Sequence, residues 1–275
     1  MRRPPDVALA ATLHDPTAGL ADDVRRFLPE LQRRYCAVAV ATSPPTSARI
    51  VAMLADAGVH AGTPPSNTRG PLYRLSVRVA LASGAARVHY LDFDRALHWL
   101  RRAPREHAAV VRLAGRHDGS IWIGRTPLAH ASHHRPLHAT ETVVNRLVAD
   151  GLGLRGRVDF LAPSFVLDRT RAAALLQRSR ARDAAVYGEW PAILAALDAT
   201  PAYLECRGLD WETPDRHRAA VRRLGRARWR QRQDTPAEWA LRTNLATEIV
   251  HGFERALVRA GHPRPTLRRL PPRQY

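Results

Sequence analysis

Asp92 and Asp94, two aspartates separated by one residue, are the side chains in this sequence best placed to do chemistry. They follow a short apolar run at 88–91, and a helical pattern begins just after them. The order predicts a buried strand whose carboxyl end carries two carboxylates. Hard oxygen ligands of this kind suit Mn²⁺ or Mg²⁺, which bind through one or two carboxylates together with substrate phosphates. The structural alternative is that Asp94 caps the helix and Asp92 closes a turn.

The first third of the chain alternates between strand and helix patterns. Strands are predicted at 7–13, 35–41, 59–61 and 87–91, and helices at 20–34, 46–57, 71–83 and 96–102. This alternation with short connections predicts an α/β fold, a mostly parallel sheet with helices on both faces. Ligands of such sheets bind outside the carboxyl ends of the strands. We therefore expect the aspartate pair to converge with His14 and Asp15, which follow the first strand.

The remainder of the chain has a less regular pattern. Strands are predicted at 108–113, 120–124 (a hairpin return) and 202–206, an extended segment at 158–165, a loop at 127–136, and helices at 140–152, 170–180 and 189–197. Thr235 to Glu238 forms a capping box, and apolar residues then recur every fourth position from Leu241 to Leu257, which predicts a long helix. We divide the chain into an α/β domain at 1–212, a helical C-terminal extension at 213–260, and a disordered, Pro- and Arg-rich tail at 261–275.

Basic residues outnumber acidic residues, 43 against 25, for a formal charge of +18. Such a charge ordinarily points to a polyanionic partner. All the basic residues are arginine, however, and Ala, Pro and Leu are abundant, which indicates the composition of a GC-rich genome. We therefore disfavour nucleic acid as the partner. The arginine-rich segment 216–232 is typical of a solvated face, and contact with an anionic membrane or nucleic acid is its alternative.

The cysteines and the apolar segments predict a cytoplasmic protein. Cys36 and Cys206 form no CxxC pair, so neither a disulfide framework nor a zinc knuckle is indicated. No segment has the roughly 20 apolar residues of a membrane span. The apolar run near the N-terminus is too short for a signal peptide and matches a first strand.

Three features of residues 7–212 resemble the nucleotide-diphospho-sugar transferases of the GT-A glycosyltransferase fold. They are the strand–helix alternation, the Asp-Phe-Asp motif within 90–95 (YLDFDR), and the segment 187–191 (YGEWP) leading into a helix. With 123–126 (IGRT) and the Thr-Glu pair at 140–141, the chain is similar to a little-characterised bacterial group of GT-A-like proteins.

The resemblance implies a metal-dependent glycosyltransferase that uses a nucleotide-diphosphate sugar donor and an acceptor that the sequence does not identify. Asp94 would coordinate Mn²⁺ or Mg²⁺ bridging the diphosphate, and Asp92 would contact the ribose or the metal. The positions that match the family's donor-binding parts are His14, Asp15 and Thr17 for the base and ribose, and Arg69, Arg74 and Arg95 for the phosphates.

Inverting members of the superfamily carry a catalytic carboxylate at the start of a helix that faces the acceptor, and Glu189 is the matching position. As a general base it would take the proton of the acceptor hydroxyl. Its structural alternative is a stabilising acid near a helix N-terminus. The family more often has Glu-Asp there, and Asp183 and Glu141 are the second choices for the base.

Other residues that could do chemistry have weaker patterns. His130, His133 and His134 lack the spacing of a metal-binding helix and are predicted to lie in a solvated loop. Trp211 either belongs to the core or stacks on a sugar face. Two alternative functions stay open: a nucleotidyltransferase, which the absence of a Gly-rich, lysine-bearing phosphate loop disfavours, and a non-catalytic nucleotide- or polyanion-binding protein.

Overall fold

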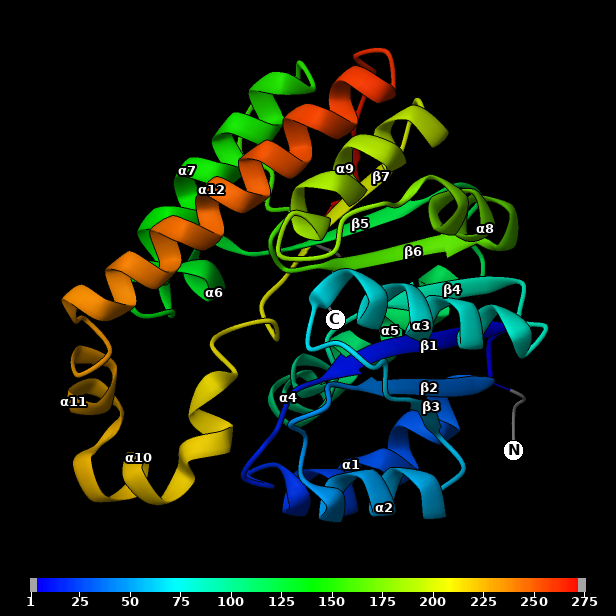
Figure 1. Cartoon of the computed structure of the whole chain (residues 1–275). Coiled ribbons are helices and arrows are strands. Elements are labelled where there is room, and N and C mark those ends of the chain that lie inside the picture. Colours follow the sequence, from blue (N-terminus) through cyan, green and yellow to red (C-terminus); the bar gives the residue numbers. More distant parts are fainter. Residues whose placement is uncertain (1–3, 272–275) are drawn as a thin grey trace.

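One sheet runs through residues 4–271, the part of the chain that the computed structural model describes (Figure 1). Its strands lie in the order β3-β2-β1-β4-β6-β5-β7-β8. They are β1 (Val7–Leu13), β2 (Ala37–Thr42), β3 (His60–Gly62), β4 (Arg87–Tyr90), β5 (Ile121–Arg125), β6 (Ser164–Asp168), β7 (Ala202–Cys206) and β8 (Arg268–Arg269). β6 is antiparallel to β4 and β5, and the other neighbouring pairs are parallel.

Helices cover both faces of this sheet. They are α1 (Ala21–Arg34), α2 (Ala48–Asp56), α3 (Arg69–Ala82), α4 (Phe93–Arg102), α5 (Pro104–Ala114), α6 (Pro127–Ala131), α7 (Arg135–Gly151), α8 (Arg169–Arg178), α9 (Val186–Leu197), the 3-10 helix η1 (Thr213–His217), α10 (Arg218–Leu224), α11 (Arg226–Gln231) and α12 (Pro236–Arg259). One hydrophobic core lies under α1, α2, α4 and α5, and the other under α3, α7, α8, α9 and α12. The expected α/β fold, with a mostly parallel sheet between helices, is confirmed.

Strand β1 shows why the sheet can be covered on both sides. All seven of its residues are buried. Alternate side chains of a strand point to opposite faces, so Ala8 and Ala10 enter one core while Leu9 and Leu13 enter the other. A continuous apolar run is therefore what a central parallel strand requires.

The expectations for 108–127 need correction. The apolar run at 108–113, predicted as a strand, belongs to α5. His107, Val110, Val111 and Ala114 are buried at helical spacing, a face that a six-residue window does not reveal because short apolar runs fit either structure. The 120–124 strand exists as β5, but it pairs with β6 and β7 rather than returning from a hairpin.

Two further segments differ from their predictions. The predicted loop at 127–136 folds as α6 and the start of α7. Of the predicted extended segment 158–165, only the last two residues enter a strand, β6.

The C-terminal region is helical as expected, and it packs into the main core. Thr235 accepts a hydrogen bond from the backbone N–H of Glu238 at 3.2 Å, which is the capping interaction that starts α12. α12 then lies against α9 so closely that a Cβ on Gly188 would overlap the carbonyl oxygen of Ile249. Ile249 and Phe253 belong to the same core as β1 and β4, so 213–260 is not a separate layer.

The tail at 261–275 was predicted to be disordered, and that expectation is wrong for its first eleven residues. Arg268–Arg269 forms the edge strand β8 beside β7. The backbone N–H groups of Thr266 and Leu270 donate to the carbonyls of Ala199 and Tyr203, each at 2.8 Å. Residues 272–275 lie outside the described residues. None of the helices described between residues 4 and 271 combines the length and apolar character needed to cross a bilayer.

Candidate functional site

A cavity of about 500 Å³ opens at the carboxyl ends of β1 and β4. One wall carries Thr12 and His14 from the end of β1, Arg69 from the start of α3, and the aspartate pair. The opposite wall comes from α7, α12 and the segment around residues 212–216. The chain therefore brings the two predicted strand ends together at one rim, and later segments, from α7 onward, close the other side.

Asp92 turns its carboxylate into a group of hydroxyls instead of capping α4. It occupies the N-cap position of α4 but makes no capping hydrogen bond. Its Oδ1 accepts from Thr12 Oγ1 at 3.0 Å, from the Tyr90 hydroxyl at 3.1 Å and from the Tyr73 hydroxyl at 3.3 Å. These donors come from β1, β4 and α3, so three elements fix the orientation of one side chain.

The surroundings of Asp92 favour its protonated form. Burial raises the pKa of this carboxyl, the charge of Asp94 raises it further, and Arg95 with the hydroxyl hydrogen bonds opposes them, leaving a pKa of about 6. Burial also raises the pKa of Tyr73 and Tyr90 well above the usual range, so both phenols remain protonated donors.

Asp94 is held by a cation from far along the chain. Its Oδ2 accepts a hydrogen bond from Arg216 Nη2 of η1, and its Oδ1 accepts from the backbone N–H of Arg95 at 2.9 Å. The Nε of Arg216 is buried and has no partner in the described part of the chain. Sequence reasoning placed Arg216 on a solvated face, and no local pattern distinguishes it from the neighbouring arginines.

Arg95 is a second guanidinium of the cavity with spare hydrogen-bonding capacity. It is buried, with Nε 3.8 Å from Asp92 Oδ2 and Nη2 3.7 Å from Glu212 Oε1. Its Nη1 is buried without a partner among residues 4–271. Buried donors normally have partners, so the free N–H groups of Arg95 and Arg216 point to an anionic ligand in this cavity.

The aspartate pair fits a divalent cation that shares its ligands with a substrate. Asp92 Oδ2 accepts no hydrogen bond from the described residues, and its nearest cation is Arg95. Mg²⁺ and Mn²⁺ bind through one or two carboxylates together with waters and phosphate oxygens. Residues 4–271 hold no cluster of three or more His, Cys, Asp or Glu side chains arranged for a metal. A cation here would therefore take further ligands from the substrate, and Arg216 would have to release Asp94.

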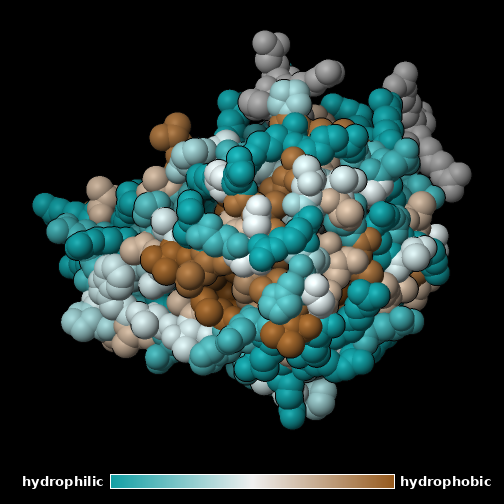
Figure 2. Space-filling model, turned by 90° about the horizontal axis from the view of Figure 1, so that it is seen from above, coloured by the Kyte–Doolittle hydropathy of each residue, from teal (hydrophilic) through white to brown (hydrophobic). Residues whose placement is uncertain are grey.

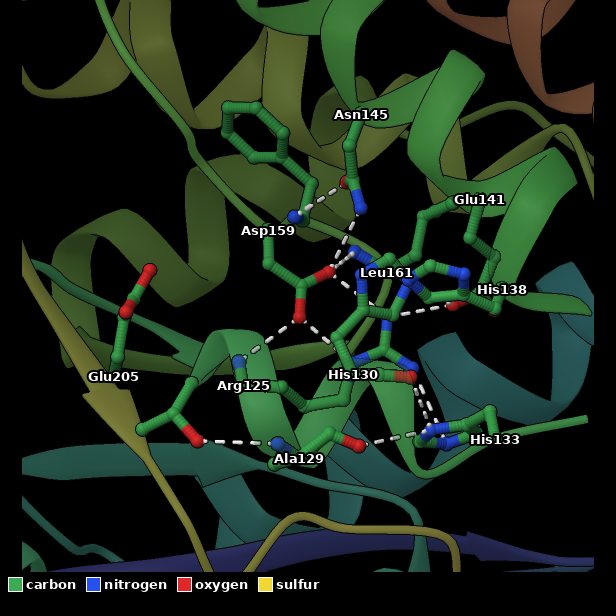
Figure 3. A network of polar contacts seen from close by, with 12 residues as sticks. Arg125, Ala129, His130, His133, His138, Glu141, Asn145, Asp159, Leu161 and Glu205 are labelled. Atoms are coloured by element: carbon green, nitrogen blue, oxygen red, sulfur yellow. Dashed lines mark hydrogen bonds and ion pairs between the residues drawn. The ribbon is translucent and has the colours of Figure 1, made fainter.

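The opposite wall is stiffened by a buried charge network centred on Arg125 (Figure 3). Its guanidinium donates to Asp159 at 2.7 and 2.9 Å and to Glu141 Oε2 at 2.6 Å. Asn145 donates to Asp159 at 2.9 Å, which joins α7 to the same network. Although burial raises the pKa of Glu141, the charge of Arg125 brings it down to about 2. Glu141 lines the cavity, but it is an ionised, paired group and a poor base at neutral pH.

The three histidines predicted to lie in a solvated loop are buried, so that expectation is wrong. α6 and the N-terminal end of α7 turn His130, His133 and His134 inward. His134 Nε2 lies 2.9 Å from Glu238 Oε1 of α12, and His133 Nε2 lies 3.7 Å from Glu212 Oε2. Burial lowers the pKa of His133 and His134.

Glu212 is a cavity carboxylate that sequence reasoning did not select. It is buried, and its Oε2 has no hydrogen-bond partner within residues 4–271. Burial raises its pKa, but Arg95 and His133 outweigh that effect and hold the pKa well below the usual range. Trp211 beside it is fully buried, with its ring 5.0 Å from that of Trp229 and 5.4 Å from that of His134. Trp211 is a core residue, and a sugar-stacking role for it is excluded.

Five of the predicted site residues line the cavity: His14, Arg69, Asp92, Asp94 and Arg95. Three donor-site candidates do not. Asp15 accepts from the backbone N–H groups of Gly19 and Leu20 and so closes the turn before α1. Thr17 is exposed beside that turn. Arg74 donates to the carbonyl of Ala181 at 2.7 Å, which ties α3 to the segment before α9.

The predicted base Glu189 also lies away from the cavity, in the first turn of α9. It is buried and accepts from Ser179 Oγ at 2.7 Å, from the backbone N–H of Arg180 at 2.7 Å, and from Arg259 Nη2 at 2.9 Å. These contacts fasten segment 179–181 to α9 and α12, which is the structural alternative for this residue. The second choice Asp183 likewise bonds locally, to the backbone N–H of Ala185 at 2.9 Å.

Comparison with known proteins assigns no family, since no family model matches the chain and no curated protein is significantly similar to it.

Proposed function

We propose that this protein is a metal-dependent glycosyltransferase that binds a nucleotide-diphosphate sugar in the cavity at the ends of β1 and β4. The observation that carries the proposal is the placement of Asp92 and Asp94 in a ligand-sized cavity beside Arg95 and Arg216, whose buried N–H groups lack partners. Paired carboxylates and unpaired guanidinium groups together suit a diphosphate with its cation. The free thiols of Cys36 and Cys206 fit the cytoplasmic location that we also propose.

In this proposal the aspartates bind the metal and the arginines bind the phosphates of the donor. Asp92 and Asp94 would hold Mn²⁺ or Mg²⁺, which when bound neutralises charge on the departing diphosphate. Arg95 and Arg216 donate charge-assisted hydrogen bonds to phosphate oxygens. Arg69 adds a third guanidinium at the N-terminus of α3, where the helix dipole also favours an anion.

The transfer itself exchanges one bond at the sugar. The acceptor hydroxyl oxygen forms a bond to the anomeric carbon while the bond from that carbon to the diphosphate breaks. The nucleoside diphosphate leaves with the electron pair, and its departing phosphate oxygen takes up the hydroxyl proton. Glu212 is the cavity carboxylate best placed to stabilise positive charge on the sugar, because it is ionised and has a free oxygen. It takes the place of Glu189 as the carboxylate of the site, but as a charge-stabilising group and not as a base.

The ion pair between Arg216 and Asp94 favours a second candidate, a nucleotide-binding protein in which arginine takes the place of the cation. A thermal-shift screen separates the two. We expect Mn²⁺ and a nucleoside diphosphate together, at about 100 times Kd, to raise the melting temperature by roughly 5–10 °C. Asp94→Ala should remove the metal-dependent part, and the matched variant Asp22→Ala, at an exposed position on α1, should retain it.

Other outcomes of the screen identify the alternatives. A nucleoside diphosphate that stabilises the protein equally with and without Mn²⁺ would support the metal-free binding protein. A larger shift with a nucleoside triphosphate, followed by pyrophosphate release, would support a nucleotidyltransferase. Released nucleoside diphosphate in the presence of a nucleotide sugar would identify the transferase directly.

A further inference from the structure

An apolar groove of about 400 Å³ lies beside the cavity, between α7 and α12. Val143 and Leu147 of α7 and Trp239 and Val250 of α12 line it, and threonines and alanines fill in between. His251 is the single titratable residue of its lining. Figure 2 views the molecule from above and shows hydrophobic patches lying among hydrophilic ridges on this side.

The groove and the cavity are neighbours that share a wall. Thr140, Val144 and Ala246 line both spaces. On the cavity side the apolar lining continues with Leu137, Leu245 and Ile249. An apolar chain in the groove could therefore be continuous with a polar group in the cavity.

Exposed hydrophobic side chains gather on the same helices. Of residues 4–271, five large hydrophobic side chains are exposed, and all five lie on α6, α7 or α12: Leu128, Val143, Leu147, Leu241 and Val258. Scattered single residues of this kind need no explanation, whereas a cluster on one part of the surface marks an interaction site.

The two helices that flank the groove contact each other near both of their ends. α7 and α12 run side by side in the same direction (Figure 1). His134 bonds Glu238 at 2.9 Å near their N-terminal ends, and at the other end Gly151 allows Phe253 so close that a Cβ there would collide with the ring. A slot between two pinned helices suits a thin chain, because the broad face of another protein domain could not enter it.

Basic and aromatic groups stand at the groove's entrance. The Arg135 guanidinium lies 5.9 Å from the centre of the Trp239 ring, and the Arg135 side chain is 77% exposed. Arg242 lies one turn further along α12 and lines the cavity. Arg135 pairs with Asp234 at 3.6 Å and Arg242 pairs with Glu238 at 2.7 Å. Tryptophan with arginine beside an apolar groove is typical of a protein–membrane interface, where the ring meets the acyl region and a lipid phosphate would compete with these carboxylates for the cation.

We propose that this groove holds the hydrocarbon chain of the acceptor, an anionic membrane lipid whose head group lies in the adjacent cavity. The acceptor assignment rests on the proposed glycosyl transfer, whereas the chain-binding site does not. The adjacency of an apolar groove and a polar cavity favours an amphiphile over a second copy of the protein, which would match the groove alone.

The fluorescence of Trp239 reports whether a chain occupies the groove. The other tryptophans are buried, so a quencher in the groove reaches Trp239 first. We expect monomeric dodecyl phosphate brominated near its chain end to quench fluorescence saturably, and Trp239→Phe to remove that quenching. Vesicles of brominated phosphatidylglycerol should quench in the same way, and brominated phosphatidylcholine vesicles at least tenfold less.

Two groove variants and one matched control decide the location of the chain. Leu147→Asp, which places a charge in the slot, and Ala139→Phe, which fills it, should each weaken dodecyl phosphate binding at least tenfold. Leu128→Asp changes a more exposed leucine, on α6 outside the groove, and should leave the affinity unchanged. Equal loss in Leu128→Asp, or no saturable quenching, would overturn the proposal.

The remaining outcomes separate this inference from the proposed function. Light scattering that shows a dimer broken by Leu147→Asp would assign the groove to a second copy and overturn the lipid. Chain binding without any nucleotide response would leave the chain site standing while both the transferase and the acceptor assignment fail. A nucleotide response without chain binding would retain the transferase and remove the lipid acceptor.

Discussion

Arg216 in η1 pairs with Asp94 at the start of α4, 122 positions earlier in the chain, and this contact closes the polar half of the cavity. The pair brings a cation to the place where a diphosphate would lie. It also sets the C-terminal half of the chain against the end of the central strand β4.

Replacement of Arg216 by alanine should weaken nucleotide binding. A hydrogen bond to a charged group contributes about 1.5–3 kcal/mol, so we expect the Kd of a nucleoside diphosphate to rise roughly 10- to 100-fold in Arg216→Ala. The measurement is isothermal titration calorimetry with Mn²⁺ present. Arg218→Ala, which removes a neighbouring arginine that pairs with Asp23 on α1, is the control and should leave Kd unchanged. A similar loss in both variants would mean that net charge alone attracts the nucleotide.

Local patterns in the sequence predicted one wall of this site and missed the other. Asp92, Asp94 and His14 follow predicted strands directly, and parallel strands bring their carboxyl ends to one edge whatever follows. Arg216 and Glu212 reach the cavity only because η1 folds back onto α4, a long-range contact that leaves no local signature. The only local hint at Glu212 was its neighbour Trp211, for which the sequence suggested a core or a sugar-stacking role.

The wrong predictions for three candidate site residues have a common physical cause. Glu189 and Asp15 lie near element ends, and Arg74 lies inside α3. Polar side chains can bind either a ligand or the unpaired backbone groups of nearby helix ends and turns. All three satisfy backbone groups here. The sequence shows the residue type in each case, but the choice between the two uses depends on which segment packs opposite.

The raised pKa of Asp92 predicts a pH-dependent stability difference that Asp92→Asn should reveal. The pKa of about 6 lies above the ordinary value of 3.8, so the folded state binds this proton more tightly than the unfolded state. The associated stability is fully present below pH 3.8 and is lost as the pH rises through 6. The difference in the free energy of unfolding between Asp92→Asn and the wild type, measured in urea, should therefore shift in favour of the variant between pH 3.8 and pH 7, by on the order of 2–3 kcal/mol.

A parallel difference curve for Asp22→Asn, which removes an exposed carboxylate from α1, provides the control. If the two difference curves coincide, the carboxyl of Asp92 titrates normally and its hydroxyl partners stabilise the charged form.

Glu189→Gln should destabilise the fold and leave ligand binding intact. The carboxylate is buried and accepts from two backbone N–H groups, a hydroxyl and Arg259. Glu189→Gln weakens these charge-assisted hydrogen bonds, and solvent screens the pair with the half-exposed Arg259, so we expect a loss of about 1.5–3 kcal/mol. Urea denaturation should show that loss, whereas Glu254→Gln, on the exposed face of α12, should change stability by less than about 0.5 kcal/mol. A stable Glu189→Gln protein that had lost sugar transfer would instead restore Glu189 as the catalytic base.

The contacts of His98 predict how the cavity wall that carries Glu212 and Arg216 responds to pH. Its two ring nitrogens lie 2.7 Å from Asp210 Oδ1 and from Asp215 Oδ2, the two carboxylates that flank Glu212. Burial lowers the pKa of this imidazole, but the two hydrogen bonds outweigh burial and raise the pKa above 6.5. Burial raises the pKa of both aspartates, and their bonds to His98 outweigh it and bring the pKa of each below 3.8.

Segment 210–217 should therefore be held most strongly between pH 3.8 and pH 6.5. The stability from His98 is fully present below pH 6.5 and is lost as the pH rises through its higher folded pKa, whereas the stability from the aspartates is lost as the pH falls below 3.8. Amide hydrogen exchange, corrected for the intrinsic pH dependence, should show residues 210–217 losing protection from pH 6 to pH 9. His98→Gln should lose that pH dependence and weaken nucleotide binding, while His262→Gln, at an exposed position, should behave as the wild type. Protection that stays constant in the wild type over this range would show that the segment is held by its packing against α4 and not by the imidazolium.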